Sequence, residues 1–158
     1  MVIGLLLLIG SAAGYFIFVR KPADLNSPRG VVTRYINAIS DGNVTTMKAL
    51  FVPGRQPPQQ YLDFVSGFFS SGMIKYKNPE YKNIKENPAE AEIELTDMDI
   101  VISIAGQTAT QKLSAVEPGH KALVYKLKYG SGKWLLYEAP LPLSGYAPNV
   151  PTTPFNGG

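Results

Sequence analysis

The amino-acid sequence predicts an α+β protein with an apolar N-terminal helix and an extended C-terminal tail. Apolar residues recur at helical spacing between residues 28 and 72 and at alternate positions between residues 74 and 137. A run of helices followed by a run of strands is typical of helices packed on one face of an antiparallel sheet. The pattern divides the chain into a transmembrane helix (1–20), a linker (21–27), an α+β domain (28–138) and a Pro-rich extended tail (139–158).

The composition limits the classes to which the protein can belong. Its 158 residues predict one folded domain. Fifteen basic and twelve acidic side chains give a dispersed net charge of +3, which is too small for the basic stripe that nucleic-acid binding requires. The chain has no cysteine, which excludes a disulfide scaffold, a cysteine metal site and a cysteine nucleophile.

Residues 1–20 are predicted to form a transmembrane helix. Val2–Val19 is a stretch of 18 uncharged residues, which spans about 27 Å as a helix, close to the bilayer core of about 30 Å. Arg20 and Lys21 follow, and Pro22 ends the helix. A cleaved signal peptide is the alternative, but such a segment normally begins with basic residues. We therefore expect a single-pass membrane protein with the lipid bilayer as one partner.

Small residues on this helix predict a packing face. Gly10 and Gly14 form a GxxxG pair, with Ser11 between them. Small side chains let another helix approach closely in lipid, so these three residues are predicted to pack against other membrane-protein subunits. The alternative is that the glycines reflect only the usual composition of membrane helices.

Three helices are predicted in the first half of the domain. Ser27-Pro28 supplies a favourable N-cap and first helical residue, and Asn43 is the N-cap of a short second helix. Pro57-Pro58 opens the third helix. Glycine commonly ends helices, and Gly42 and Gly72 are the expected ends of the first and third.

Alternating apolar residues from position 74 onward predict about four to six antiparallel strands. The longest stretch has its apolar residues at odd positions up to Leu95 and at even positions from Met98. A one-residue slip would turn side chains to the opposite face, so a bulge is expected at Thr96-Asp97 to absorb it. Pro79 is expected to interrupt the first strand. The later strands are predicted at residues 108–116, 123–129 and 134–137, with a hairpin loop at 130–132.

Two segments resemble the nuclear transport factor 2-like domains. Ser27–Phe51, SPRGVVTRYINAISDGNVTTMKALF, resembles their helical opening, and Leu123–Glu138, LVYKLKYGSGKWLLYE, resembles their final hairpin. The resemblance is compatible with residues 28–138 and is greatest for small secreted or membrane-anchored members. It implies a cone, in which a curved antiparallel sheet wraps around helices and the interior holds a substrate, a ligand or packed side chains.

If the cone has a cavity, aromatic side chains from several predicted elements would line it. Tyrosine and tryptophan combine an apolar ring with one polar group, which suits an apolar small ligand. At periodic positions such residues are more often part of a packed core. The cavity candidates are Tyr35, Tyr61, Phe68, Phe69, Tyr125 and Trp134, with Tyr76 beside them.

We expect no catalytic site, cofactor or metal site in this chain. Enzymes of the superfamily that it resembles use carboxylates, histidines and tyrosines that converge inside the cone. The single histidine, His120, is in a predicted turn. Asp97 and Asp99 form a D-x-D pair that could bind a cation or act as a base, but they are expected at a solvated, bulged part of a strand.

A candidate docking surface is predicted on the longest strand. Residues 86–99 contain six acidic side chains and no basic one. Glu90, Glu92 and Glu94 alternate with apolar residues, which places them on one exposed face. We interpret them as an acidic patch that could dock a basic partner, and the alternative is a solvated face with no partner.

The tail is predicted to be extended. Five prolines in residues 139–158 prevent a regular helix or a central strand and favour polyproline-like geometry. Tyr146 and Phe155 are its candidate partner contacts, because the tail is apolar and uncharged. A disordered C-terminus is the alternative.

These features together predict a noncatalytic accessory, assembly or scaffold subunit of a larger membrane complex. One span followed by such a domain resembles the inner-membrane scaffold proteins of type IV secretion and conjugation machines. A membrane-tethered domain that binds a small ligand is the alternative, and a pilin-like filament subunit is a weaker one. The resemblance and the uncharged tail favour an extracytoplasmic domain, whereas the Lys and Arg residues after the span favour the cytoplasmic side.

Overall fold

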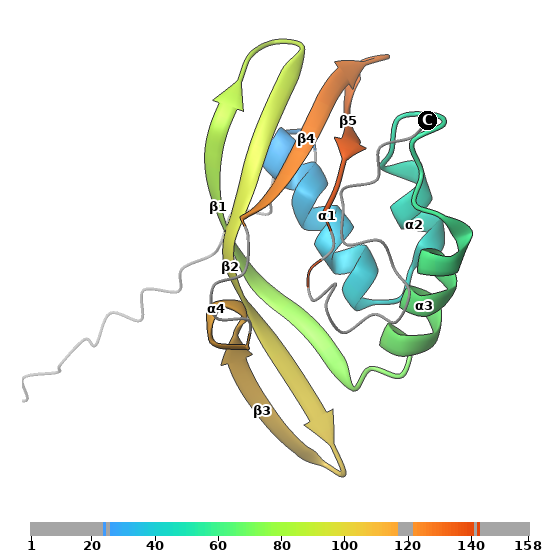
Figure 1. The fold of residues 1–158 in the computed structure, drawn as a ribbon, viewed down its shortest axis with the longest axis vertical. Helices are drawn as coiled ribbons and strands as arrows, with labels where there is room; N and C mark the ends of the chain where they lie inside the picture. Colours follow the sequence, from blue (N-terminus) through green and yellow to red (C-terminus); the bar gives the residue numbers. More distant parts are fainter. Residues whose placement is uncertain (1–23, 25, 117–121, 141, 143–158) are drawn as a thin grey trace, which may run out of the picture.

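The computed structural model describes residues 24, 26–116, 122–140 and 142 (Figure 1). In these ranges, none of the helices combines the length and the hydropathy that crossing a bilayer needs. The predicted transmembrane helix and most of the tail lie outside the described residues. So do the candidate residues Gly10, Ser11, Gly14, His120, Tyr146 and Phe155.

Three helices open the domain where the sequence predicts them. They are α1 (Pro28–Ser40), α2 (Val44–Ala49) and α3 (Gln59–Phe69). The Ser27 hydroxyl accepts a hydrogen bond from the Gly30 N–H (3.1 Å), and Asn43 Oδ1 accepts one from the Thr46 N–H (3.0 Å). Both side chains satisfy backbone donors that have no partner inside the helix, so the two predicted N-caps are confirmed.

The described residues also form one five-stranded antiparallel sheet. Its elements are β1 (Ile74–Glu86), β2 (Glu90–Ile104), β3 (Gln107–Lys112), the short helix α4 (Leu113–Val116), β4 (Leu123–Gly130) and β5 (Lys133–Glu138). The order is β1-β2-β4-β5, and β3 pairs with the second half of β2. β2 is therefore the long central strand. It pairs with β1 along one side, and on its other side its first half pairs with β4 and its second half with β3 (Figure 1).

β2 keeps its apolar side chains on one face through a one-residue irregularity. Ile93 and Leu95 are buried at odd positions, whereas Met98 and Ile100 are buried at even positions. The pairing with β1 shifts at this point and skips Thr96. The predicted bulge at Thr96-Asp97 is confirmed, and it lets both halves of the strand face the helices.

β1 carries a matching irregularity. Its register shifts between Lys77 and Glu80, and Asn78 in between has a φ of 49°. Pro79 shifts the register but does not interrupt the strand, which continues to Glu86. A proline has no N–H to donate, and an edge strand tolerates this loss on its outer side.

The strand predicted at residues 108–116 is wrong in its second half. β3 ends at Lys112, and the chain turns into α4. Asp97 on β2 explains the turn, because its Oδ1 accepts a hydrogen bond from the Ser114 N–H (3.2 Å) and its Oδ2 one from the Ser114 hydroxyl (3.0 Å). This turn could not be predicted from residues 108–116 alone, because the carboxylate that stabilises it belongs to another strand.

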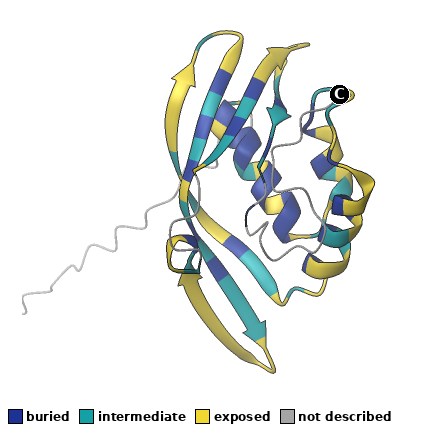
Figure 2. Cartoon of the chain, viewed as in Figure 1, coloured by how far each residue is buried: buried dark blue, intermediate teal, exposed yellow. Residues whose placement is uncertain are grey.

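α1 lies between the sheet on one side and α2 and α3 on the other (Figure 1). Its residues Val32, Tyr35, Ile36 and Ile39 are at most 1% exposed, because both layers cover them. Figure 2 shows the buried residues concentrated on α1 and on the central parts of β2 and β4, and the exposed residues on β3 and the outer parts of the strands. The predicted α+β architecture, with helices on one face of an antiparallel sheet, is confirmed.

Two hydrogen bonds join the end of α1 to β1. Ser40, which is 4% exposed, accepts one at its hydroxyl oxygen from the Tyr76 N–H (2.9 Å). The Ser40 carbonyl accepts another from Lys75 Nζ (2.9 Å). β1 is an edge strand, so N–H groups on its outer side have no neighbouring strand, and Ser40 supplies the acceptor for one of them.

We predict that Ser40→Ala lowers the free energy of unfolding by about 1–3 kcal/mol, because it removes the acceptor of the buried Tyr76 N–H. Denaturant unfolding of the purified chain, followed by the fluorescence of its only tryptophan, measures this change. Ser70→Ala is the matched control, since Ser70 is an exposed serine after α3, and it should change stability by less than about 0.5 kcal/mol. Equal losses in the two variants would contradict the role of Ser40.

Candidate functional site

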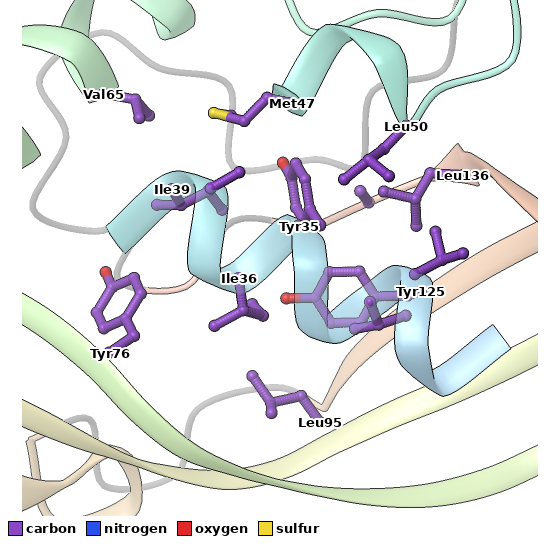
Figure 3. Close-up of a cluster of buried hydrophobic side chains, with 14 of the residues drawn as sticks. Tyr35, Ile36, Ile39, Met47, Leu50, Val65, Tyr76, Leu95, Tyr125 and Leu136 are labelled. Atoms are coloured by element: carbon purple, nitrogen blue, oxygen red, sulfur yellow. The ribbon is translucent and has the colours of Figure 1, made fainter. Parts of the chain in front are cut away.

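Four tyrosines from four different elements meet inside the domain. Tyr35 on α1, Tyr61 on α3, Tyr76 on β1 and Tyr125 on β4 are each at most 3% exposed. The ring centroids of Tyr35 and Tyr125 are 6.1 Å apart, in an edge-to-face arrangement. Figure 3 shows the hydroxyls of Tyr35, Tyr76 and Tyr125 among buried apolar side chains. The fold thus brings together all four tyrosines that the sequence indicated as cavity lining.

Burial keeps these phenols neutral. The loss of hydration raises the pKa of Tyr35, Tyr61 and Tyr125 well above the ordinary value of 10.0, because burial disfavours the charged form. A side-chain hydrogen bond joins Tyr35 and Tyr61. At neutral pH the cluster therefore offers hydroxyl groups to a ligand, but no negative charge that could act as a base.

Tyr125 differs from its neighbours in its hydrogen bonding. Its hydroxyl is fully buried and has no hydrogen-bond partner within the described ranges. A buried polar atom without a partner costs about 1–3 kcal/mol relative to a bonded one. This hydroxyl is therefore the polar group of the interior best suited to bind a ligand.

Two of the sequence-predicted cavity residues lie elsewhere, which corrects that interpretation. Phe68 is 40% exposed on the outer side of α3. Trp134 is half-buried beside the β4–β5 turn, where its ring lies 5.3 Å from that of Tyr129. Phe69 is buried, and its ring lies 5.2 Å from Tyr76. Consecutive helical residues point about 100° apart, so Phe68 and Phe69 do not both face the interior.

The carboxylates of Glu90, Glu92 and Glu94 form a mixed surface with lysines from the neighbouring strands. Glu92 lies opposite Lys126 on β4 and opposite Lys85 on β1. Lys85 Nζ is also 3.1 Å from a Glu90 carboxylate oxygen. The predicted acidic patch is therefore wrong, because the sheet places bases beside a run that has none in the sequence. Docking of a partner on these glutamates stays a prediction.

A surface pocket of about 190 Å³ lies beside this surface, between β2, β4 and β5. The charged groups that line it pair with other side chains. Lys126 Nζ is 2.7 Å from a Glu138 oxygen, and Lys128 Nζ is 4.2 Å from the centre of the Tyr137 ring. Arg55 also donates a hydrogen bond to the Tyr137 hydroxyl (2.7 Å). Such a lining does not suit the apolar small ligand that the sequence suggested.

Asp97 and Asp99 bond to groups of the protein itself. Asp97 holds Ser114 at the start of α4, and Asp99 accepts hydrogen bonds from Asn78 Nδ2 (2.6 Å) and Lys112 Nζ (3.1 Å). The described part of the chain contains no group of three or more acidic or histidine side chains placed to hold a metal ion. These contacts join β1, β2, β3 and α4, which gives the D-x-D pair a structural role.

An exposed apolar surface lies where α3 is followed by β1, at the end of β2. We call these residues the apolar rim: Phe68, Met73 and Ile104 are exposed, and Phe64, Ile74 and Ile102 are half-buried and packed against the core. Ile74 pairs with Ile102 across the strands, and the Met73 carbonyl accepts a hydrogen bond from the Ser103 N–H (2.8 Å). The rings of Phe64 and Phe68 are stacked with centroids 5.3 Å apart.

The apolar rim is exposed because the strands are longer than the helices that cover them. At 3.3 Å per residue the 15 residues of β2 extend about 50 Å, whereas the 13 residues of α1, the helix that packs on the sheet, extend about 20 Å at 1.5 Å per residue. Met73 is consequently 49% exposed and Ile104 63% exposed. Sequence reasoning missed this surface, although the difference in predicted lengths was a signal that could have found it. Grouped exposed apolar side chains commonly mark interaction sites.

No family model matches the chain, and no curated protein matches it. The solved structures that are similar to it include the following two. One is a Xanthomonas campestris protein described as a calcium/calmodulin dependent protein kinase II association domain, with a TM-score of 0.49, 12% identity, and coverage of 68% of this chain and 79% of that one. The other is an uncharacterized Caulobacter vibrioides protein with a cystatin-like fold, with a TM-score of 0.47, 10% identity, and coverage of 68% and 80%.

We predict that Tyr125→Phe leaves the free energy of unfolding unchanged or raises it by up to about 1 kcal/mol, because it removes a buried hydroxyl that has no partner. Tyr81→Phe is the matched control, since the Tyr81 hydroxyl accepts a hydrogen bond from Thr33 (3.1 Å), and this variant should be less stable than the parent. Denaturant unfolding compares them. A loss of more than about 1 kcal/mol in Tyr125→Phe would show that its hydroxyl makes a stabilising bond.

The contacts of Asp97 predict a sensitivity to acid. Burial alone would raise the pKa of Asp97, but hydrogen bonds from Ser114 and Met98 and the charge of Lys112 outweigh it and lower the pKa below the usual 3.8. Since the pKa is lower in the folded state, ionised Asp97 stabilises the fold above about pH 4, and this contribution is lost as the pH falls through the folded-state value. We predict that Asp97→Asn lowers stability at pH 7 by about 1–2 kcal/mol.

The difference between Asp97→Asn and the parent should begin to shrink below about pH 4 and disappear as the pH falls through the lowered pKa of folded Asp97, where its carboxylate becomes protonated. Glu94→Gln is the control, because no hydrogen bond or ion pair of Glu94 comparable to those of Asp97 is found among the described residues. Unfolding curves at a series of pH values measure both variants. A difference for Asp97→Asn that stays constant through the acid range would contradict the assigned role.

Proposed function

We propose that this chain is a noncatalytic accessory or scaffold subunit of a membrane complex. In this proposal residues 1–20 hold it in the bilayer, and the domain docks a partner subunit through the apolar rim. The observation that carries the proposal is the exposure of Phe68, Met73 and Ile104, which are 40%, 49% and 63% exposed. Large exposed apolar side chains are stabilised when a partner removes them from water.

The finer fold assignment also belongs to this proposal. We propose that the domain is a nuclear transport factor 2-like cone, because its three helices precede a sheet whose long central strand is bulged. In such a cone the space between helices and sheet is the place for a ligand. Here that space contains packed, buried side chains from α1, α3, β1, β2 and β4, which favours a scaffold over a binding cavity.

Binding of a small apolar ligand is the second candidate function. The observation in its favour is the buried Tyr125 hydroxyl, which has no hydrogen-bond partner in the described part of the chain. A ligand with one hydrogen-bonding group and an apolar body would match this hydroxyl, the ring of Tyr35 beside Tyr125, and the Phe51 ring that contacts Tyr35. Such a ligand would have to displace or rearrange the packed core.

The test of the scaffold function uses a variant of the rim. The full chain is extracted in mild detergent, and its native mass and co-purifying subunits are measured. We predict that the parent migrates in a defined complex. The triple variant Phe68→Ser, Met73→Ser, Ile104→Ser should co-purify with at most about a tenth of the partner that the parent retains, since about 1.4 kcal/mol of lost binding free energy corresponds to a factor of ten in affinity.

Ile84→Ser is the matched control. Ile84 is 49% exposed, as Met73 is, but it lies near the opposite end of β1. This variant should keep the complex intact, and circular dichroism should show that both variants are folded. A parent that migrates alone, or a folded triple variant that keeps its partner, would contradict docking through the apolar rim.

A further inference from the structure

We infer that the β4–β5 turn rests on the anionic surface of the bilayer in which the chain is anchored. Lys128 and Lys133 then bind lipid phosphates, and Tyr129 and Trp134 lie at the level of the headgroups. This inference rests on the proposed function, because it takes the predicted transmembrane helix as the anchor, and it adds a lipid contact made by the folded domain. It is carried by the contacts among these side chains, by their chemistry, and by the place where the chain enters the domain.

An aromatic pair, Tyr129 and Trp134, stands at the turn. The two residues are opposite each other on β4 and β5, and their ring centroids are 5.3 Å apart in an edge-to-face arrangement. Tyr129 is 48% exposed, and Trp134 is half-buried. The turn beyond them contains Ser131 and Gly132, whose φ values are 52° and 76°. These side chains are small, so nothing bulky at the tip of the turn keeps the two rings away from a surface.

One exposed lysine directly precedes each residue of the aromatic pair. These are Lys128 and Lys133, and neither forms an ion pair with a carboxylate in the ranges that the structure describes. Lys128 Nζ lies instead 4.2 Å from the centre of the Tyr137 ring. Glu90 is opposite Lys128 on β2, but its carboxylate is bonded to Lys85 (3.1 Å). Both ammonium groups can therefore bind an anion outside the protein.

This combination of side chains matches the headgroup region of an anionic bilayer. Tyrosine and tryptophan combine an apolar ring with one polar group, and both are enriched where a membrane meets water. Lysine lays its apolar stem along such a boundary and brings its ammonium group to the lipid phosphates. Residues 122–137 contain three lysines and no acidic residue. The hairpin formed by β4 and β5 is therefore attracted to a negatively charged surface.

The chain enters the domain at the same end as this turn. At the start of α1, Arg29 Nε donates a hydrogen bond to Asn83 Oδ1 (2.6 Å) near the end of β1. The turn after β1 contacts β4, because the Tyr129 N–H donates a hydrogen bond to the Ala89 carbonyl (2.8 Å). The start of α1 and both turns therefore lie toward one end of the domain (Figure 1). The strand residues of the apolar rim lie at the opposite ends of β1 and β2, so contact with the bilayer leaves them accessible to a partner subunit.

The linker is long enough for the turn to touch the bilayer. Asn83 is level with Tyr125 on β4, since both are paired with Ile93 on β2. The turn begins five residues beyond Tyr125, which places it about 16 Å past the start of α1. The seven linker residues before α1 extend up to about 25 Å. A bilayer that holds the predicted transmembrane helix can therefore lie against the turn.

Trp134 makes a direct test available, because it is the only tryptophan of the chain. The full chain is reconstituted alone in nanodiscs of phosphatidylcholine and phosphatidylglycerol, some of whose headgroups carry a nitroxide that quenches nearby tryptophan. Quenching is measured relative to nanodiscs without the nitroxide. We expect strong quenching of Trp134 in these nanodiscs. It should weaken in nanodiscs of phosphatidylcholine alone and at high salt, which screens the lysine charges.

Variants of the turn test the contact residue by residue. Lys133→Gln should lower the ratio of docked to undocked domain about fivefold, which is the contribution of one lysine at an anionic membrane surface. Lys77→Gln is the matched control, because it removes another exposed lysine in the first half of β1, and it should leave the quenching unchanged. Tyr129→Ser should also weaken the quenching, whereas Met73→Ser should not, although these two side chains are 48% and 49% exposed. Circular dichroism should show that all four variants are folded.

Three results would overturn the inference. Equal quenching in the two lipid compositions, or equal losses in Lys133→Gln and Lys77→Gln, would show that the lysines of the turn do not bind the lipid. A chain that enters the nanodiscs with Trp134 unquenched would leave the turn free for a protein partner instead. A chain that does not enter the nanodiscs would contradict the anchor itself, and with it the proposed function. No partner subunit is present, so the result is independent of the co-purification test of the apolar rim.

Discussion

The single inserted residue at Thr96 is the constraint on which the rest of the structure depends. β2 pairs with β1, β3 and β4, so its two halves must present their apolar side chains to the same helices. The skipped residue makes this possible, because it restores Met98 and Ile100 to the face that Leu95 occupies. The bulge also positions Asp97 to bond Ser114, which is what ends β3 and begins α4. Without it, half of the sheet would present its apolar face to water.

Much of the fold could be predicted from the sequence because its signals are local. The Ser27 and Asn43 caps depend on donors within three residues of the cap, and the phase change in β2 is visible in the order of its apolar residues. The four interior tyrosines follow from the same periodicity, which places each of them on the inner side of its element. The interior of the candidate site was therefore predictable, although the missing hydrogen bond of Tyr125 was not.

The remainder depends on contacts between distant parts of the chain. The lysines beside Glu92 come from β1 and β4, and the carboxylate that starts α4 comes from β2. The exposed apolar residues at the end of β2 arise from the unequal lengths of α1 and β2, and no single residue of the sequence indicates them. As a result, the interior was predicted more accurately than the surface, and the proposed function of the protein depends on the surface.

The irregular outer edge of β1 has a consequence for how this protein behaves in concentrated solution. An exposed edge strand invites a second molecule to extend the sheet, which is a common route to aggregation. Here the Tyr76 N–H is already bonded to Ser40, Asn78 is in a left-handed conformation, and Pro79 has no N–H. The edge of β1 around Tyr76–Pro79 therefore does not offer a second copy a continuous ladder of backbone hydrogen bonds. With a net charge of only +3, electrostatic repulsion between copies of the protein is weak. The irregular edge of β1 is therefore a second feature that opposes aggregation.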